Sequence, residues 1–311
     1  MYDNDGNEVF LPGYRVDALT DASIDYIQEN KEEPFFLFVS YLEPHFQNSR
    51  DDYPAPLGYE EKFLNPWTPP DLQALEGSQA RHLPGYYGMV KRLDEALGRL
   101  QEALISMGLD EDTIILYTSD HGCHFKTRNG EYKRSCHDSS IRIPMAFSGP
   151  GFEHGGRLKE MMSLIDVPPT LLDACNIPVP DSMEGNSILP LLNRTEEDWP
   201  EEIFSEICDG GTLRRCVRTQ RWKYSVKATT NLGENEGHPV QYKEEKLFDL
   251  KADPWELNNL IGYKSHQGVS RVMKNRLREY LDRVEKKEIT IIEAPEVSSG
   301  QKKLKKEEWY Q

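Results

Sequence analysis

Two continuous apolar runs constrain the fold of this chain more than any other feature. Residues 35–42 read Phe-Phe-Leu-Phe-Val-Ser-Tyr-Leu, and residues 113–119 read Thr-Ile-Ile-Leu-Tyr-Thr-Ser. Runs of this length without polar alternation are typical of strands that are covered on both faces, as in a parallel sheet. Both are far shorter than the roughly 18 apolar residues of a transmembrane helix. We therefore predict buried strands and no membrane span.

Helical and strand-like patterns alternate around these two runs. Thr20 is a suitable N-cap for the first helix. The predicted elements are helices at 20–30, 86–107 and 167–175 and a third short strand at 144–148. Alternation of this kind predicts a largely parallel sheet covered by helices.

The pattern changes after Pro200. Short alternating segments predict an antiparallel subdomain, and an amphipathic helix follows them. The strands are expected at 203–207, 214–219, 223–227 and 246–250, and the helix at 269–288. The last residues, Lys-Lys-Leu-Lys-Lys-Glu-Glu-Trp-Tyr-Gln, predict a solvated or loosely docked tail. We thus expect an α/β part at 1–200, an antiparallel subdomain with a helix at 201–290 and a charged tail at 291–311.

The charge of the chain limits which kinds of molecule it can bind. The net charge is −16, and a surface of that sign repels nucleic acid and anionic membranes. Between His121 and Arg142, however, five Lys and Arg side chains stand against two acids, a local charge of +3. This reversal predicts an anion site, and a solvated loop with scattered charge is the alternative.

The number and spacing of the cysteines argue against two kinds of cysteine-dependent structure. Five are widely spaced and form no Cys-x-x-Cys pair. An odd number without framework spacing argues against a disulfide scaffold and against a zinc site. We expect most of them to be small, buried or half-buried residues.

Ionisable residues follow both apolar runs. Glu43-Pro44-His45 comes after the first, and Asp120-His121-Gly122 comes after the second. Ligands of parallel α/β sheets bind beyond the carboxyl ends of the strands. A carboxylate there is suited to a divalent cation, and Gly122 lets the backbone turn close to the site. The alternative for Asp120 is that it caps the next segment.

Residues 130–144 hold several hydrogen-bond donors. Lys133 carries a compact charge with three donors, which suits an anionic group. His137 either donates to a substrate oxygen or is a structural histidine.

These segments resemble a known family. Ser-Asp-His-Gly at 119–122, Tyr-Lys-Arg-Ser-Cys-His-Asp-Ser-Ser-Ile-Arg-Ile-Pro at 132–144 and Gly-Pro-Gly at 149–151 resemble the metal- and sulfate-binding part of formylglycine-dependent sulfatases, in the alkaline-phosphatase-like superfamily. Further segments match in the same order, at 35–45, 165–172, 218–224 and 247–260. The resemblance covers residues 15–262. It implies an incomplete alkaline-phosphatase-like sandwich, with a mostly parallel central sheet plus a small C-terminal antiparallel sheet and helix.

The resemblance also implies roles for single residues. Asp120 would ligate a calcium ion, with His121 as a second ligand or as a neighbour of the nucleophile. Lys133 would bind the sulfate, and His45 would assist departure of the alcohol. The implied substrate-pocket residues are His124, Arg128, His137 and Arg142.

One part of the family's active site does not occur in these 311 residues. The family's nucleophile lies in a Cys/Ser-x-Pro/Ala-x-Arg motif that is oxidised to formylglycine, and no cysteine or serine here fits it. The N-terminal pair of aspartates that completes the calcium site is also absent. We therefore expect the C-terminal part of a sulfatase, inactive alone, that associates with a separate N-terminal half or with itself. A non-catalytic pseudoenzyme or assembly partner and a phosphoesterase of the same superfamily are the alternatives.

Substrate and compartment follow only from the resemblance. We expect a sulfated small molecule or carbohydrate, and aromatic residues between Tyr53 and Tyr87 suit stacking on sugar rings, with core packing as the alternative. Residues 1–13 are polar and acidic and do not resemble a signal peptide. Relatives are often exported, so a periplasmic or secreted protein is the family expectation.

Overall fold

The structure is a computed structural model that describes residues 2, 5–47, 49–153, 155–195, 198–231, 239–286, 288–299 and 303–311. The chain folds into two compact units. The first comprises Met1–Pro69, Gly77–Leu116 and Phe147–Glu153, and the second comprises Pro70–Glu76, Tyr117–Ala146 and His154–Gln311.

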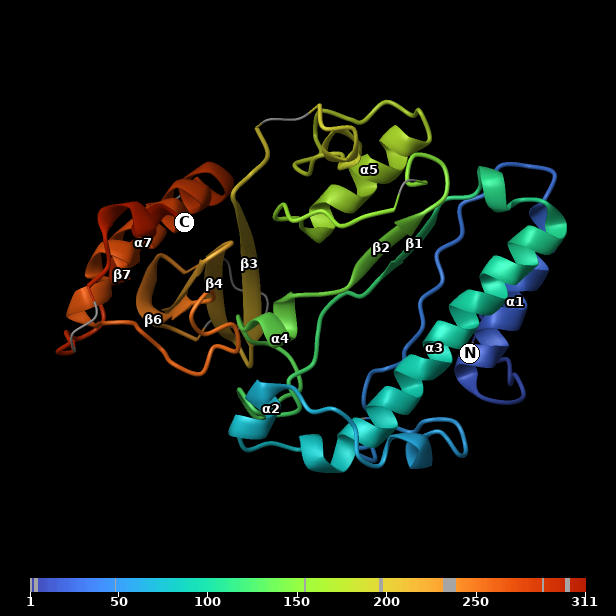
Figure 1. Cartoon of the computed structure of the whole chain (residues 1–311), viewed down its shortest axis with the longest axis horizontal. Coiled ribbons are helices and arrows are strands. Elements are labelled where there is room, and N and C mark those ends of the chain that lie inside the picture. Colours follow the sequence, from blue (N-terminus) through green and yellow to red (C-terminus); the bar gives the residue numbers. More distant parts are fainter. Residues whose placement is uncertain are drawn as a thin grey trace. The chain divides into compact units, whose positions relative to one another are not determined.

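Among the described elements, helices dominate before residue 200, with β1 and β2 as two short strands, and strands dominate after it (Figure 1). The helices are α1 (Arg15–Asn30), α2 (Pro70–Ala74), α3 (Gln79–Met107), α4 (Asp138–Ile141), α5 (Val167–Ala174), α6 (Leu189–Leu192) and α7 (Gln267–Glu285). The strands are β1 (Ile115–Thr118), β2 (Met145–Ser148), β3 (Glu202–Asp209), β4 (Thr212–Thr219), β5 (Trp222–Ala228), β6 (Gln241–Asp249) and β7 (Thr290–Ile292). β1 and β2 pair in a two-stranded sheet.

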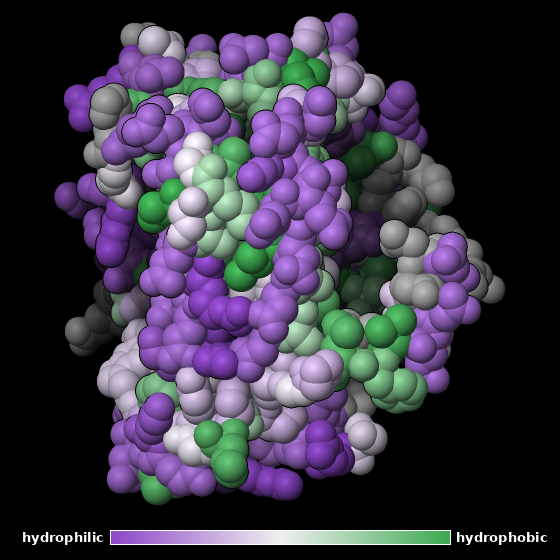
Figure 2. Space-filling model, turned by 90° about the vertical axis from the view of Figure 1, so that its right-hand side faces the viewer, coloured by the Kyte–Doolittle hydropathy of each residue, from purple (hydrophilic) through white to green (hydrophobic). Residues whose placement is uncertain are grey.

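In the first unit, α1 lies along α3 (Figure 1). Val16 of α1 packs against Leu93 and Ala96 of α3, and Arg92 of α3 pairs with Asp17 of α1 at 2.7 Å. Over these helices the surface is mainly hydrophilic, with separate hydrophobic patches (Figure 2). Both helices begin earlier than predicted.

The helix starts were predicted too late for two reasons. Thr20 is not an N-cap, because it lies inside α1 and its hydroxyl donates to the carbonyl of Val16 at 2.6 Å. α3 continues through Pro84, although proline removes one main-chain hydrogen bond. The buried face of α3 extends to both sides of Pro84, so packing outweighs that loss.

The run 35–42 is extended but is not a strand, which corrects the prediction. Its side chains alternate between partly buried and exposed, and Phe36 and Phe38 are 76% and 80% exposed. A strand requires main-chain hydrogen bonds to a neighbour, and no described strand pairs with this run. Composition predicted burial on both faces, whereas pairing decides whether such a run becomes a strand.

In the second unit, five strands form one sheet in the order β3-β4-β5-β6-β7. The pairs from β3 to β6 are antiparallel, and β7 pairs with β6 in parallel. Helix α7 packs on one face, where its Met273 and Leu277 meet Trp222 and Tyr224 of β5. The four predicted antiparallel strands and the predicted helix are confirmed.

The tail beyond residue 303 is docked on this sheet rather than solvated. The ring of Trp309 packs against the core between β5 and α7. The indole nitrogen of Trp222 donates to the carbonyl of Glu308 at 2.6 Å, and Thr219 donates to the carbonyl of Gln311 at 2.8 Å. Lysines in the sequence of the tail suggested solvation, whereas its single tryptophan provides the contact.

The described elements confirm an α/β protein with a small antiparallel sheet and helix after residue 200. The predicted boundaries at residues 200 and 290 stay predictions. Among the described helices, none combines the length and the apolar character that crossing a membrane requires.

Candidate functional site

Seven of the eight predicted site residues lie in the second unit, in the segment that links β1 to β2 (Figure 1). Gly122 begins the turn of this segment. Its N–H donates to the carbonyl of Ser140 at 2.8 Å, and a Cβ atom at Gly122 would lie 2.2 Å from the carbonyl oxygen of Ser139. Only glycine allows the two backbones to approach this closely.

Asp120, His121 and Lys133 converge at one point of this segment. The ammonium of Lys133 lies 2.7 Å from Nε2 of His121, and a carboxylate oxygen of Asp120 lies 3.4 Å from the same nitrogen. The Asp120 side chain is 82% exposed, whereas Lys133 is half-buried. A cation, an imidazole and an open carboxylate are thus brought together from positions 12 residues apart.

Hydrogen bonds assign the tautomer of His121. Its Nδ1 lies 2.8 Å from the carbonyl oxygen of Gly122, which can only accept. Nδ1 therefore carries the proton, and Nε2 accepts from the ammonium of Lys133. This leaves two of the three ammonium N–H groups of Lys133 for an anion.

His124 holds the backbone of Lys133. Its side chain is fully buried, and Nε2 donates to the carbonyl of Lys133 at 2.9 Å. Asn129, which the sequence did not indicate, donates to the same carbonyl at 2.9 Å. Burial lowers the pKa of His124 and so favours its neutral form. This geometry indicates that His124 fixes the backbone of Lys133. A contact of His124 with substrate stays a prediction.

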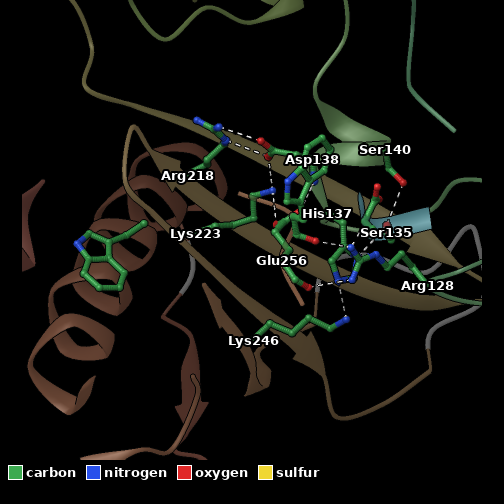
Figure 3. Close-up of polar contacts among 12 residues, drawn as sticks. Arg128, Ser135, His137, Asp138, Ser140, Arg218, Lys223, Lys246 and Glu256 are labelled. Atoms are coloured by element: carbon green, nitrogen blue, oxygen red, sulfur yellow. Dashed lines mark hydrogen bonds and ion pairs between the residues drawn. The ribbon is translucent and has the colours of Figure 1, made fainter. Parts of the chain in front are cut away.

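His137 is a buried histidine with a partner on each nitrogen (Figure 3). Nδ1 lies 3.1 Å from the hydroxyl of Ser135, which lies 2.9 Å from that of Ser140. Nε2 lies 3.1 Å from the ammonium of Lys246 on β6. Burial, and next the charge of Lys246, lower the pKa of His137 far below its usual range. The geometry supports the structural alternative, and its contact with substrate stays a prediction.

Arg128 is anchored to the second unit's C-terminal part. Its guanidinium donates to the carbonyls of Glu256 and Trp255 at 2.9 and 2.7 Å, and it lies 3.8 Å from the Asp71 carboxylate. Only 7% of the side chain is exposed. Arg142, in contrast, is exposed. Their predicted contacts with substrate stay predictions.

His45 lies in the first unit. Its Nδ1 is 2.6 Å from the carbonyl of Phe46, and its ring stacks on the Phe46 ring at 4.8 Å. Because a carbonyl only accepts, Nδ1 carries the proton and Nε2 is the nitrogen available for chemistry.

Four residues that the sequence did not single out form a buried ion cluster, namely Asp138, Arg218, Lys223 and Glu256 (Figure 3). Arg218 donates to both carboxylate oxygens of Asp138 at 3.0 and 2.9 Å. Lys223 pairs with Asp138 and, at 2.7 Å, with Glu256. Burial raises the pKa of Asp138, but the Arg218 hydrogen bonds and the Lys223 charge outweigh it and hold this pKa well below its usual range.

A weak signal for this cluster was present in the sequence. Lys223 stands between Trp222 and Tyr224, whose side chains face α7. Since side chains alternate along a strand, Lys223 faces the other side of the sheet. Lysine at a central strand position requires a buried carboxylate, but the sequence does not say which one.

Comparison with known proteins identifies the family. The sulfatase family model matches residues 1–177, more than half of the chain. The chain belongs to the sulfatase family. A second model, N-sulphoglucosamine sulphohydrolase, C-terminal, matches residues 130–283 of this sulfatase.

Individual relatives agree with this assignment. Arylsulfatase K of Bos taurus is 26% identical over 338 residues, which cover 93% of this chain and 57% of that protein. The sulfatase spans 31% to 57% of the length of the curated relatives that it matches.

Solved structures share the fold of this chain. The yidJ protein of Bacteroides fragilis superposes with a TM-score of 0.75 at 23% identity, over 90% of this sulfatase and 61% of that chain. The protein BT4656, solved in complex with its substrate D-glucosamine-2-N,6-O-disulfate, superposes with a TM-score of 0.66 at 21% identity. The match covers 91% of this sulfatase and 72% of the BT4656 chain.

The residues present do not by themselves fit the calcium ion expected for a sulfatase. Calcium takes about six to eight oxygen ligands. Asp120 offers one carboxylate, and the Nε2 atom of His121 already accepts from Lys133. Among the described residues, no three His, Cys, Asp or Glu side chains are grouped as metal ligands. Asp120 could supply one ligand of such a site but not a complete site.

Proposed function

We propose that this sulfatase chain supplies the sulfate-binding side of an active site that hydrolyses a sulfate ester. The observation that carries the proposal is the 2.7 Å contact of Lys133 with His121 beside the open carboxylate of Asp120. His121 orients the Lys133 ammonium, whose other two N–H groups donate to sulfuryl oxygens. The local charge of +3 between His121 and Arg142 attracts the anion in a chain of net charge −16.

His45 is the proposed acid for the leaving alcohol. Its Nδ1 is held by the Phe46 carbonyl, so a second proton would be carried and released by Nε2. This role rests on the resemblance of residues 35–45 to the family.

A polypeptide limited to these 311 residues is proposed to bind sulfate without hydrolysing its esters. Lys133, oriented by His121, can hold an anion, but no Cys/Ser-x-Pro/Ala-x-Arg motif is present to supply the nucleophile. Hydrolysis would then require the nucleophile segment from elsewhere. Calcium likewise would need ligands beyond Asp120.

The proposed substrate is a sulfated carbohydrate. The substrate of the structural neighbour BT4656 is a disulfated glucosamine. The aromatic stretch gives mixed support, because Tyr53 is buried against His82 and Tyr86, whereas Trp67 is 67% exposed. Core packing therefore accounts for Tyr53, and Trp67 is the proposed sugar-facing ring.

Calorimetric titration with inorganic sulfate tests the anion site. We expect wild-type binding and at least about ten-fold weaker binding by Lys133→Ala, because a hydrogen bond to a charged group contributes about 1.5–3 kcal/mol and about 1.4 kcal/mol is a factor of ten. Arg134→Asn is the matched control, since it removes an exposed charge from the neighbouring position and asparagine tolerates its left-handed φ of 62°. Equal losses in both variants would show a diffuse field instead of a site.

Two further measurements complete the test. p-Nitrophenyl sulfate with added calcium should show no turnover by this chain, and turnover that disappears in Lys133→Ala would contradict the proposed inactivity. Inorganic phosphate should compete more weakly than sulfate, and the opposite order would favour the phosphoesterase alternative.

A further inference from the structure

The segment that presents Lys133 is fixed at both ends by one short stretch of the C-terminal part. We call residues 124–138 the Lys133 loop. Near its start, Arg128 donates to the main-chain carbonyls of Trp255 and Glu256 at 2.7 and 2.9 Å. At its end, the N–H of Asp138 donates to the Glu256 carboxylate at 2.6 Å. Glu256 thus contacts the loop on both sides of Lys133, through its main chain and its side chain (Figure 3).

Inside the loop, the backbone is in a conformation that needs support. Phe125, Lys126 and Arg134 have φ values of 50°, 62° and 62°, a left-handed region that costs non-glycine residues about 1 kcal/mol or more each. His124 and Asn129 both donate to the Lys133 carbonyl at 2.9 Å. A loop of this kind keeps its shape only while its surroundings hold it.

Glu256 is itself held in a demanding position. It is 3% exposed and has a φ of 54°. Its carboxylate accepts from Lys223 at 2.7 Å, and Lys223 also pairs with Asp138, which Arg218 holds from the other side. Two carboxylates and two cations therefore neutralise one another, whereas loss of one member would leave an unpaired buried charge. Residues in strained conformations with buried, fully paired charges are often there for function.

We propose that Glu256 and Lys223 are positioning residues for Lys133, which fix both ends of its loop and so keep its ammonium on His121. This inference deepens the proposed function and rests on it for the identity of the anion. The physical reason is the flexibility of lysine: its four-carbon stem defines the ammonium position only if its backbone is fixed. Release of Asp138 and Arg128 would let the left-handed residues relax and withdraw Lys133 from His121.

The first readout uses no ligand, so it is independent of the proposed function. The ¹⁵N resonance of His121 Nε2 reports the hydrogen bond from Lys133, and Lys133→Ala defines its position when that bond is absent. We expect Glu256→Gln to move this resonance toward the Lys133→Ala value. Asp249→Asn is the control, because Asp249 is also a buried carboxylate paired with an arginine, Arg221 at 3.1 Å, and its described side-chain hydrogen bonds come from Arg221 and Ala252, outside the Lys133 loop.

The second readout is inorganic sulfate. Glu256→Gln should weaken sulfate binding by no more than Lys133→Ala does, because it displaces the ammonium that Lys133→Ala removes, and Asp249→Asn should leave sulfate binding unchanged. If Glu256→Gln does not fold, Arg128→Gln releases only one end of the loop and should give a smaller shift in the same direction. Thermal unfolding of each variant separates these local effects from global loss of structure.

A His121 resonance that stays at its wild-type position in folded Glu256→Gln or Arg128→Gln overturns the positioning role, even if sulfate binds. Equal shifts in Glu256→Gln and Asp249→Asn overturn it too, because the effect would then be general destabilisation. Absence of sulfate binding by the wild-type chain overturns the proposed function but leaves the His121 readout of Glu256 intact.

Discussion

Nε2 of His137 lies 3.1 Å from the ammonium of Lys246, so a buried imidazole accepts a hydrogen bond from a half-buried cation. A protonated His137 could not accept, and it would face the Lys246 charge in a site with little solvent. Burial lowers the pKa of both side chains. The pair therefore links β6 to the segment between β1 and β2 only while His137 is neutral.

The first prediction concerns pH. Because the folded pKa of His137 lies below the unfolded value of about 6.5, the unfolded chain binds a proton that the folded chain does not. The stability that the neutral, buried His137 contributes to the folded state is complete above about pH 6.5 and is lost as the pH falls below that value. The free energy of unfolding, measured with urea between about pH 7.5 and 5, should rise with pH. His137→Asn should reduce this slope by up to about 1.4 kcal/mol per pH unit.

The remaining slope in that variant should come partly from His124, whose pKa burial also lowers. Identical slopes for wild type and His137→Asn would show that His137 is solvated.

The second prediction concerns the thiols. All five cysteines are free, but Cys136 and Cys216 are 5% and 1% exposed and are hydrogen-bonded to each other. That hydrogen bond and burial raise the pKa of the Cys216 thiol, which disfavours the reactive thiolate. With a chromogenic disulfide reagent, Cys175 and Cys208 of the native protein should react first. Cys136 and Cys216 should react only after the protein has been unfolded. Rapid labelling of Cys216 in native protein would contradict the packing of β4.

The third prediction concerns calcium. With Asp120 as the available carboxylate, about 1 mM Ca²⁺ should raise the Tm of this chain by no more than about 1 °C, because binding stabilises only by RT ln(1 + [L]/Kd). Asp120→Asn should behave like wild type in this assay. A large calcium-dependent shift that Asp120→Asn abolishes would show that further ligands gather around Asp120.

The fourth prediction concerns the docked tail. Trp309 packs against the core of the five-stranded sheet, and a Cβ atom at Gly268 would lie 2.5 Å from its ring. Trp309→Ala should lower the free energy of unfolding of the second unit by about 2–4 kcal/mol, as expected when a largely packed indole is removed. The control Tyr310→Ala removes a neighbouring ring of the same tail that is 60% exposed and should cost less than about 1 kcal/mol.

Local pattern predicted much of this molecule. Antiparallel strands β3 to β6 and helix α7 follow from alternation and helical periodicity, since both reflect which side chains must leave water. The run 35–42 shows the limit of that reasoning, because a strand also needs a neighbour, and pairing is not a property of the run itself. The sequence left open whether the tail is solvated or docked, and the packing of one tryptophan, Trp309, decided for docking.

By itself the sequence determined the class of fold, the family and the order of Asp120, His121 and Lys133 in one positively charged segment, because motifs and periodicities are written along the chain. Tertiary structure alone decided that His124 and His137 are buried and which partners they have. It alone brought Asp138 together with Arg218, Lys223 and Glu256, which are 80, 85 and 118 positions away. Such contacts depend on which face of a strand points inward and where the next chain segment crosses it, and those are properties of the packed molecule.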